Sequence, residues 1–229
     1  MKRFEDYLEK LVKLDLERSE RAGKPEAIFG EGKSTEIIIK IAEKYKEMNK
    51  PVLFTRLNEE QMFELKKLGA EVNEVARTAT FGRMGEKIGK VAILTAGTAD
   101  IPVAEEVKVT AEFLGLETIT FYDVGVAGLH RVIGPIKVIR ESDVDSVIVV
   151  AGMEGALPSI VAGLVDLPVI AVPTSIGYGV HLKGISTLFA MLQSCPSGVA
   201  VVNIDNGFGA AVFAYLISRV VRRNKWSSK

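Results

Sequence analysis

The sequence has few of the features that mark a secreted, membrane-bound or nucleic-acid-binding protein. It contains one cysteine, so no disulfide can form within the chain, and this fits a reducing compartment. Basic and acidic side chains number 29 each, a balance that gives no support to a nucleic-acid-binding face. No apolar run is long enough to cross a bilayer, and the acidic residues of the first segment argue against a signal peptide. We therefore expect a cytoplasmic protein with no nucleic-acid or membrane partner.

What is present is the composition of a folded protein in two parts. Apolar residues make up 48% of the chain and charged residues 25%, as in globular proteins. Residues 1–90 carry 36 of the 58 charged side chains, whereas residues 91–229 hold 14 of the 21 glycines. This change predicts a small N-terminal α/β module with its linker over residues 1–89 and a larger domain over residues 90–229. The linker is expected at residues 78–89.

The pattern of the first module predicts strands that alternate with helices. An amphipathic helix is expected at residues 4–15, where apolar side chains recur at helical spacing. Asn58 to Gln61 resembles a capped helix start, and Gly69 is expected to end that helix. The remaining elements are a strand at 26–29, a helix at 34–48, a strand at 51–55 and a weaker strand at 71–75. Together they make a βαβαβ unit.

The second module contains five short β-branched runs separated by segments of helical period. The runs are almost wholly apolar, as expected for strands that are covered on both faces. This order predicts a flavodoxin-like, doubly wound parallel sheet with right-handed crossovers. Ligands of such sheets bind beyond the carboxyl ends of the strands, so we expect the site in the loops that follow them. The predicted strands are 91–94, 117–121, 146–150, 169–172 and 200–204.

Polar residues follow the first two predicted strands. Thr98 and Asp100 precede a helix start whose backbone N–H groups would favour a phosphate, although an ordinary capped turn would also account for them. Arg131 could hold a phosphate or a carboxylate through two parallel hydrogen bonds. Its neighbour His130 could move protons, or it could only cap or pack against a helix.

The third and fourth loops are rich in glycine. Gly152 and Glu154 stand at a helix start in apolar surroundings, where Glu154 could act as a base or simply cap the helix. The fourth loop offers Ser175 and Lys183, and loops of this kind often close over a ligand. It could equally be a mobile connector.

Three further candidates come later in the chain. Cys195 is the lone thiol, and a lone cysteine is more often a small buried apolar residue than a nucleophile. No helix start adjoins it to activate the thiol. Asn206 and Gly207 stand in a strand-to-helix turn with the character of a phosphate loop. Polar or glycine-rich loops thus follow all five strands, and this concentration favours a binding site.

Several long motifs resemble one enzyme family. They are TAGTADIPVAEE, DVGVAGLHR, AGMEGALPSIVAGL, PVIAVPTSIGYG and SCPSGVAVVNIDNGFGAA in the second module, and LDLERSERAGKPEAIFGEGKS in the first. Along nearly its whole length the chain is similar to the pyridinium-3,5-biscarboxylic acid mononucleotide synthases (LarB) of nickel-pincer nucleotide biosynthesis. The second module is more distantly similar to PurE, the aminoimidazole ribonucleotide carboxylase and mutase, whose histidine-arginine loop corresponds to His130 and Arg131. Cys195 and the pair Met153-Glu154 depart from PurE and favour the LarB resemblance.

The resemblance implies a reaction and the residues that carry it. Nicotinic acid adenine dinucleotide would be carboxylated at position 5 of its pyridinium ring, from carbon dioxide or bicarbonate, and its phosphoanhydride would be hydrolysed to release AMP. Cys195 would add to the ring as a covalent catalyst, and Glu154 would remove the ring proton. Magnesium would assist the hydrolysis, with Asp100 as a candidate ligand. The residues expected to bind the substrate are Thr98, Asp100, His130, Arg131, Gly152, Ser175, Lys183, Asn206 and Gly207.

The sequence leaves room for two other functions and predicts self-association. A PurE-type mutase acting on aminoimidazole ribonucleotide would need no sulfur step, and a non-catalytic nucleotide-binding protein would bind a ligand without forming a product. A homo-oligomer is expected because the segments 182–192 and 210–221 are unusually apolar for exposed helices. The PurE-like relatives form homo-oligomers, commonly octamers.

Overall fold

A computed structural model describes residues 15, 18, 21, 23–85 and 87–227 of the chain. The chain divides into two compact units, Met1–Met84 and Gly85–Lys229, each with its own apolar core. The helix predicted at residues 4–15 lies outside the described residues, apart from Asp15.

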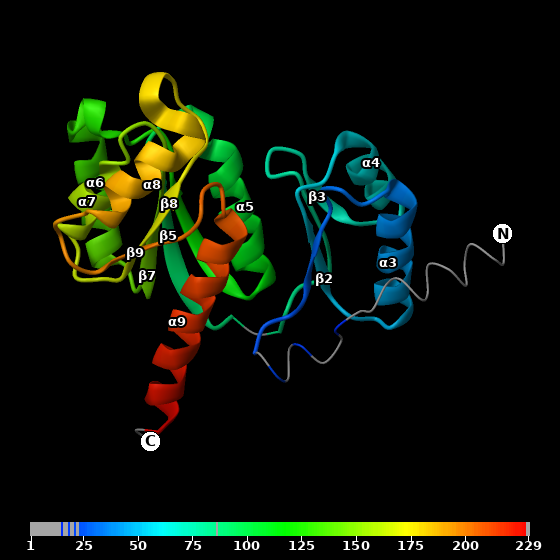
Figure 1. The fold of residues 1–229 in the computed structure, drawn as a ribbon. Helices are drawn as coiled ribbons and strands as arrows, with labels where there is room; N and C mark the ends of the chain where they lie inside the picture. Colours follow the sequence, from blue (N-terminus) through cyan, green and yellow to red (C-terminus); the bar gives the residue numbers. More distant parts are fainter. Residues whose placement is uncertain (1–14, 16–17, 19–20, 22, 86, 228–229) are drawn as a thin grey trace. The chain divides into compact units, whose positions relative to one another are not determined.

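The first unit is a four-stranded sheet covered by two helices, α3 and α4 (Figure 1). Its elements are β1 (Ala27–Phe29), α3 (Thr35–Glu47), β2 (Val52–Thr55), α4 (Glu59–Lys67), β3 (Glu71–Asn73) and β4 (Thr78–Phe81). The strand order is β1-β2-β4-β3, in which β1 and β2 are parallel and β4 is antiparallel to both of its neighbours. The alternation predicted between residues 26 and 75 is confirmed.

Part of the predicted linker proves to be a strand. Thr78–Phe81 forms β4, which pairs with β2 on one side and β3 on the other. The chain reverses just before it, where the Asn73 side chain accepts a hydrogen bond from the Ala76 amide at 2.9 Å and Arg77 adopts a φ of 54°. β4 contains a single large apolar side chain, so hydrogen bonding and packing against β2 and β3 stabilise it more than apolar side chains of its own.

α4 begins with the predicted cap, which also fixes the helix to the rest of the unit. Asn58 Oδ1 accepts from the Gln61 amide at 2.8 Å, and Gln61 Oε1 accepts from the Asn58 amide at 3.0 Å, which completes a capping box. The Gln61 side-chain amide donates to the carbonyls of Gly30 and Lys33 at 3.2 and 2.8 Å. A buried side chain therefore joins the start of α4 to the loop between β1 and α3.

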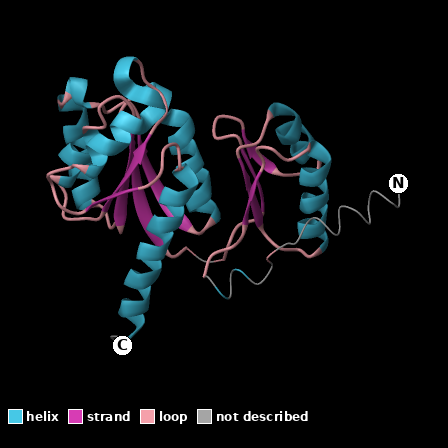
Figure 2. Cartoon of the chain, in the orientation of Figure 1, coloured by secondary structure: helices cyan, strands magenta, loops and turns pink. Residues whose placement is uncertain are grey.

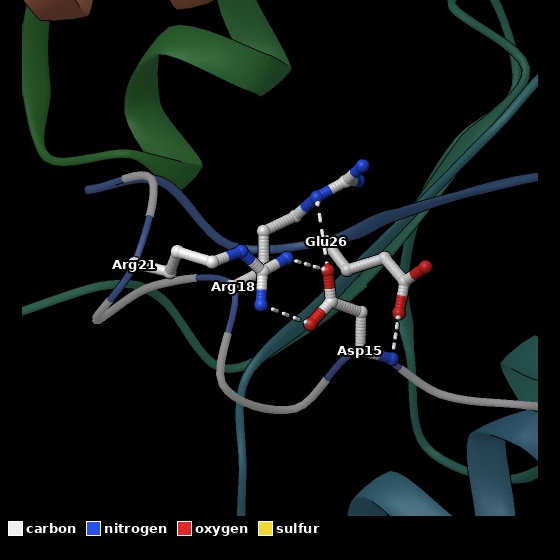
Figure 3. Close-up of polar contacts among 4 residues, drawn as sticks. All are labelled: Asp15, Arg18, Arg21 and Glu26. Atoms are coloured by element: carbon white, nitrogen blue, oxygen red, sulfur yellow. Dashed lines mark hydrogen bonds and ion pairs between the residues drawn. The ribbon is translucent and has the colours of Figure 1, made fainter.

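A small polar cluster precedes β1 (Figure 3). The hydrogen bond from Arg21 lowers the pKa of the Asp15 carboxyl, and the Asp15 amide donates to Glu26 Oε2 at 2.8 Å. Burial raises the pKa of Tyr45 to about 12, and Glu26 adds to that effect through its charge and a hydrogen bond. These contacts connect the segment before β1 to α3, which carries Tyr45.

The second unit is a five-stranded, wholly parallel sheet with helices on both faces (Figure 2). Its strands are β5 (Gly89–Thr95), β6 (Leu116–Phe121), β7 (Ser146–Ala151), β8 (Val169–Pro173) and β9 (Val199–Val201), and its helices are α5 (Ile101–Phe113), α6 (His130–Glu141), α7 (Leu157–Ala162), α8 (Ile185–Leu192) and α9 (Gly207–Ser227). Short 3₁₀ turns at Thr98–Asp100, Val126–Gly128 and Gly179–Gly184 precede α5, α6 and α8. The predicted doubly wound sheet is confirmed.

The strand order is β6-β5-β7-β8-β9, so the chain changes direction across β5. α5 and α9 lie on one face of the sheet, and α6, α7 and α8 lie on the other (Figure 1). The loops after β5 and β7 therefore leave the sheet toward opposite faces. Such a switch point opens a crevice at the carboxyl ends of the strands.

The central strands account for the apolar composition of the second unit. All six residues of β7 are buried, because helices cover both of its faces. Among the described residues, no helix is long and apolar enough to span a membrane. The cytoplasmic location stays a prediction.

We predict that Asn58→Ala lowers the free energy of unfolding by about 1 kcal/mol, because the Gln61 amide loses its acceptor. Asn58→Asp should keep most of the stability, since a carboxylate oxygen can accept the same hydrogen bond. Urea denaturation of the full chain measures the change, and hydrogen exchange at the α4 amides locates it. Equal losses in the two variants would contradict a role for the cap.

Candidate active site at the carboxyl edge of the second sheet

The loops that follow β5, β6, β7 and β8 enclose a cavity of about 450 Å³. It lies at the switch point that the strand order creates. Four of the predicted site residues line it, namely Asp100, Arg131, Gly152 and Glu154. The structure thus brings residues from three separate loops to one site, as expected for a doubly wound sheet.

Two glycines let these loops approach each other closely. A Cβ at Gly125 would lie 2.5 Å from the carbonyl oxygen of Ala96, and a Cβ at Gly152 would overlap the carbonyl oxygen of Ile176. The loop after β6 therefore packs on the loop after β5, and the loop after β7 packs on the loop after β8. Any larger residue at either position would push the cavity walls apart.

Asp100 is a buried carboxylate at the centre of these loops. Its Oδ2 accepts from the Gly97 amide at 2.9 Å, and its Oδ1 accepts from the Thr174 hydroxyl at 2.8 Å. Burial raises the pKa of the Asp100 carboxyl above its ordinary value, the bonds from Thr174 and Gly97 oppose that rise, and the nearby charge of Asp205 adds to it. The carboxylate joins the loop after β5 to the loop after β8.

Asp205 continues this connection to the last strand. Its Oδ1 accepts from the Ser175 amide at 2.7 Å, and its own amide donates to the carbonyl of Pro173 at 2.8 Å. The residue has a φ of 54°, which aims its carboxylate back at the loop after β8. Neither Asp205 nor Thr174 was among the predicted site residues, although both stand in the motifs that carry the resemblance.

Arg131 enters the cavity from the first turn of α6. Its Nη1 donates to Asp123 Oδ2 at 2.8 Å, and both side chains are partly exposed. The Asp123 amide in turn donates to the Thr95 hydroxyl at 3.0 Å, which fixes the carboxylate to the end of β5. A guanidinium oriented in this way has further N–H groups with which to bind an anion. Its predicted companion His130 is exposed and does not line the cavity.

Glu154 stands on a tight turn between β7 and α7. Met153 has a φ of 49°, and its carbonyl accepts a hydrogen bond from the Thr187 hydroxyl of α8. A Cβ at Gly155 would touch the side chains of Thr187 and Met191 at 3.0 Å. Contacts with α8 therefore hold the turn, and the exposed residue Glu154 lines the cavity.

The other predicted residues do not line the cavity. Thr98, Ser175 and Lys183 belong to the surrounding loops, and Ser175 takes part through its backbone amide. Cys195 is exposed in the segment between α8 and β9. The preceding Ser194 hydroxyl lies 2.6 Å from that of Ser159 on α7.

Asn206 and Gly207 have structural partners at the start of α9. Asn206 Oδ1 accepts from the Gly209 amide at 2.8 Å. A Cβ at Gly207 would lie 2.6 Å from the carbonyl of Val103 on α5 and 2.9 Å from the Glu106 carboxylate. Glu106 is buried and accepts from the Phe208 amide at 3.3 Å. A carboxylate of the chain itself thus stands where a phosphate was expected.

The described residues do not form a ready-made cation site. No group of three or more His, Cys, Asp and Glu side chains is placed to hold a metal in the described part of the chain. Both oxygens of Asp100 already accept hydrogen bonds inside the protein. A magnesium ion near Asp100 would need most of its ligands from substrate phosphates and water, a mode that is common for this metal. The requirement for magnesium stays a prediction.

Comparison with known proteins assigns the family. Residues 4–83 match the family described as LarB/PurE-like N-terminal domain, and residues 90–228 match the family described as AIR carboxylase. The chain belongs to the AIR carboxylase family. It also carries the N-terminal domain of LarB/PurE-like proteins.

Individual relatives cover one or both units of this AIR carboxylase family member. It is 48% identical over 230 residues to an uncharacterized protein of Methanocaldococcus jannaschii, a match that covers 96% of this chain and 89% of the relative. It is 35% identical over 127 residues to the N5-carboxyaminoimidazole ribonucleotide mutase of the same organism, covering 54% and 75% of the two chains. The crystal structure of Treponema denticola PurE matches with a TM-score of 0.45 and 20% identity, over 61% of this chain and 94% of that one. Family membership supports an enzyme of the carboxylase or mutase type.

The raised pKa of Asp100 predicts a pH-dependent stability with a definite sign. Because the folded protein holds the proton more tightly, this residue contributes stability that is fully present below its unfolded pKa, about 3.9, and is lost as the pH rises through the folded value. We expect Asp100→Asn, which mimics the protonated form, to become progressively more stable than the native protein across that window. Urea denaturation in a pH series tests this.

A second variant checks the cause. Thr174→Val removes the hydrogen bond that lowers the pKa of Asp100 in the folded protein, so the upper end of the window should move to higher pH while the lower end stays in place. A stability difference between Asp100→Asn and the native protein that does not change with pH would show that burial does not perturb this carboxyl.

Proposed function

We propose that this protein carboxylates the pyridinium ring of nicotinic acid adenine dinucleotide at position 5 and hydrolyses the phosphoanhydride to release AMP. The product would be pyridinium-3,5-biscarboxylic acid mononucleotide. The observation that carries the proposal is the position of Glu154, which lines the cavity at the switch point together with Arg131. The residue that we propose as the base and the residue that we propose as the anion-binding group thus border one site.

The reaction requires the electron-poor pyridinium ring to become a carbon nucleophile. A pyridinium is electron-poor and does not attack carbon dioxide. When the Cys195 thiolate forms a bond to a ring carbon, an electron pair moves onto the ring nitrogen and a neutral dihydropyridine results. Its enamine-like carbon 5 then attacks carbon dioxide, which forms the new carbon–carbon bond and leaves the ring cationic again. Covalent addition in this way divides one difficult step into easier ones.

The last step restores the aromatic ring. Glu154 takes the proton from carbon 5, the electron pair returns to the ring, and the carbon–sulfur bond breaks to release the thiolate. A carboxylate on a rigid turn is suited to that transfer, because a base must be held within hydrogen-bonding reach of the proton it removes. Arg131 would hold a carboxylate or phosphate of the substrate meanwhile.

Cys195 does not line the cavity of its own subunit, and this shapes the proposal. The thiol is exposed, and α8, which leads to it, exposes Phe189 and Leu192 to 60% each. Two large apolar side chains beside an exposed thiol favour a contact with a second copy of the chain. We propose that the homo-oligomer brings the sulfur of one subunit to the cavity of another.

A PurE-type aminoimidazole ribonucleotide carboxylase or mutase is the second candidate. It is favoured by the similarity of the second unit to N5-carboxyaminoimidazole ribonucleotide mutases. Those matches cover about half of this chain, whereas the 48% identical relative spans both units. A mutase also gives no role to Cys195.

The two candidates differ in their products and in their dependence on sulfur. We expect incubation with nicotinic acid adenine dinucleotide, bicarbonate and magnesium to give AMP and a mononucleotide heavier by one carboxyl group, detected by mass spectrometry. Cys195→Ser should abolish that product, and Glu154→Gln should retain substrate binding yet lose most turnover. Ser197→Ala and Glu141→Gln, exposed residues that do not line the cavity, are the matched controls. If the native protein forms no product from the dinucleotide but converts N5-carboxyaminoimidazole ribonucleotide, and Cys195→Ser retains that conversion in full, the mutase is established instead.

Mixed oligomers test where the sulfur acts. If each site combines Glu154 of one subunit with Cys195 of another, unfolding and refolding Cys195→Ser together with Glu154→Gln should restore part of the activity that each variant lacks alone. A mixed pair then contains one site with both groups intact. Absence of recovery, in oligomers shown by mass spectrometry to contain both variants, would place both groups in one subunit.

A further inference from the structure

Tyr178 is an aromatic side chain at the cavity that the proposed chemistry has not used. It lines the cavity, yet 81% of it is exposed. Tyrosine side chains usually bury much of their ring, so an exposed ring on a cavity wall suggests a surface meant for a ligand. Among the described residues that line the cavity, Tyr178 is the only aromatic one.

The backbone on both sides of Tyr178 is fixed by contacts with His181, so the Tyr178 ring projects from a fixed segment. The buried His181 ring fills the space at Gly177, where a Cβ would lie 2.5 Å from it. The Gly184 amide donates to His181 Nδ1 at 3.1 Å. One imidazole therefore holds the chain on both sides of Tyr178, at Gly177 and at Gly184.

The charges around the cavity indicate what kind of ring Tyr178 would meet. Three acidic residues line the cavity, namely Asp100, Asp123 and Glu154. Arg131 is the single basic residue among the described residues that line it. An acidic cavity favours a cationic group. The face of a tyrosine ring attracts cations as well, through its quadrupole.

We propose that Tyr178 recognises the cationic pyridinium ring of the substrate through its aromatic face and discriminates against neutral rings. This rests on the proposed function, because it takes the pyridinium nucleotide as the ligand. Arg131 binds the anionic end of the ligand, and Tyr178 covers the cationic end. Once sulfur has added, the ring is neutral and the attraction to Tyr178 falls, so the residue acts in binding and not in the chemical step.

Binding to two matched probes tests the proposal. The probes are nicotinic acid mononucleotide, whose ring is cationic, and the same nucleotide with its ring reduced to the neutral dihydropyridine. The native protein should bind the cationic probe more tightly. Tyr178→Ala should weaken that binding roughly 3- to 30-fold, the range of a cation–π contact, and leave the neutral probe much less affected. Tyr178→Phe keeps the aromatic face and should bind both probes nearly as the native protein does.

Val180→Ala is the matched control, since Val180 lies in the same loop, is 85% exposed and does not line the cavity. It should change neither affinity. Because Tyr178 is so exposed, its replacement should leave the thermal unfolding midpoint unchanged, which separates lost recognition from lost folding. In turnover, Tyr178→Ala should raise KM and should raise kcat or leave it unchanged, because the interaction is made with the cationic ring of the bound substrate and weakens as sulfur adds.

Each outcome decides the proposal. Equal losses for the two probes would mean that Tyr178 supplies shape alone, and unchanged binding would mean that it does not touch the ligand. Failure of both probes to bind the native protein would overturn this proposal together with the proposed function. If the cationic probe binds through Tyr178 but no carboxylated product forms, the proposed reaction fails and the recognition by Tyr178 stands.

Discussion

The carboxyl edge of the second unit depends on one buried carboxylate. Asp100 accepts from Gly97 on its own loop and from Thr174 on the loop after β8, and Gly152 lies between those loops where no side chain would fit. Removing a carboxylate from water is costly, and its hydrogen bonds offset only part of that cost. Because Asp100 connects two loops, the walls of the site keep a fixed separation although they come from distant parts of the sequence. Asp205 extends the same connection to the loop after β9 through the Ser175 amide.

The apolar pattern of the sequence predicted the strands well because it depends only on residues that are neighbours in the chain. Each of the five apolar runs of the second module contains a strand, although β9 ends at Val201 and not at the predicted residue 204. The loops after four of the strands meet at the cavity as the topology requires. β4 was assigned to the linker because four residues with one large apolar side chain carry little pattern. Its strand character comes from β2 and β3, which lie up to 29 residues away in the registered pairs. Pairing of that kind is not visible in a short window.

The difference between local sequence pattern and contacts over long sequence distances also explains which site residues could be predicted. Asp100, Arg131 and Glu154 were identified because each lies in the segment that follows a predicted strand, and such segments gather at the carboxyl edge. The same rule also selected Thr98, His130 and Ser175, which do not line the cavity. Gly207 also follows a strand, and local pattern alone suggested a phosphate loop there. The residue that faces it, Glu106, lies on α5 and is separated from Phe208 by 102 positions. A helix start is favourable to any anion, and in this fold the chain supplies one of its own.

Glu154 and Cys195, the two residues that the proposed reaction requires, lie in different surroundings. Glu154 stands on a turn held by Thr187 and packed against Met191 of α8. Cys195 follows the same helix on an exposed segment whose neighbour Ser194 contacts Ser159. α8 is thus fixed at its side to the turn that carries the base, while its end leads to the thiol. A second copy of the chain that docks on the exposed apolar face of α8 would meet the sulfur directly. It would also press on the helix that supports Glu154, so assembly and the position of the base would be coupled through one element.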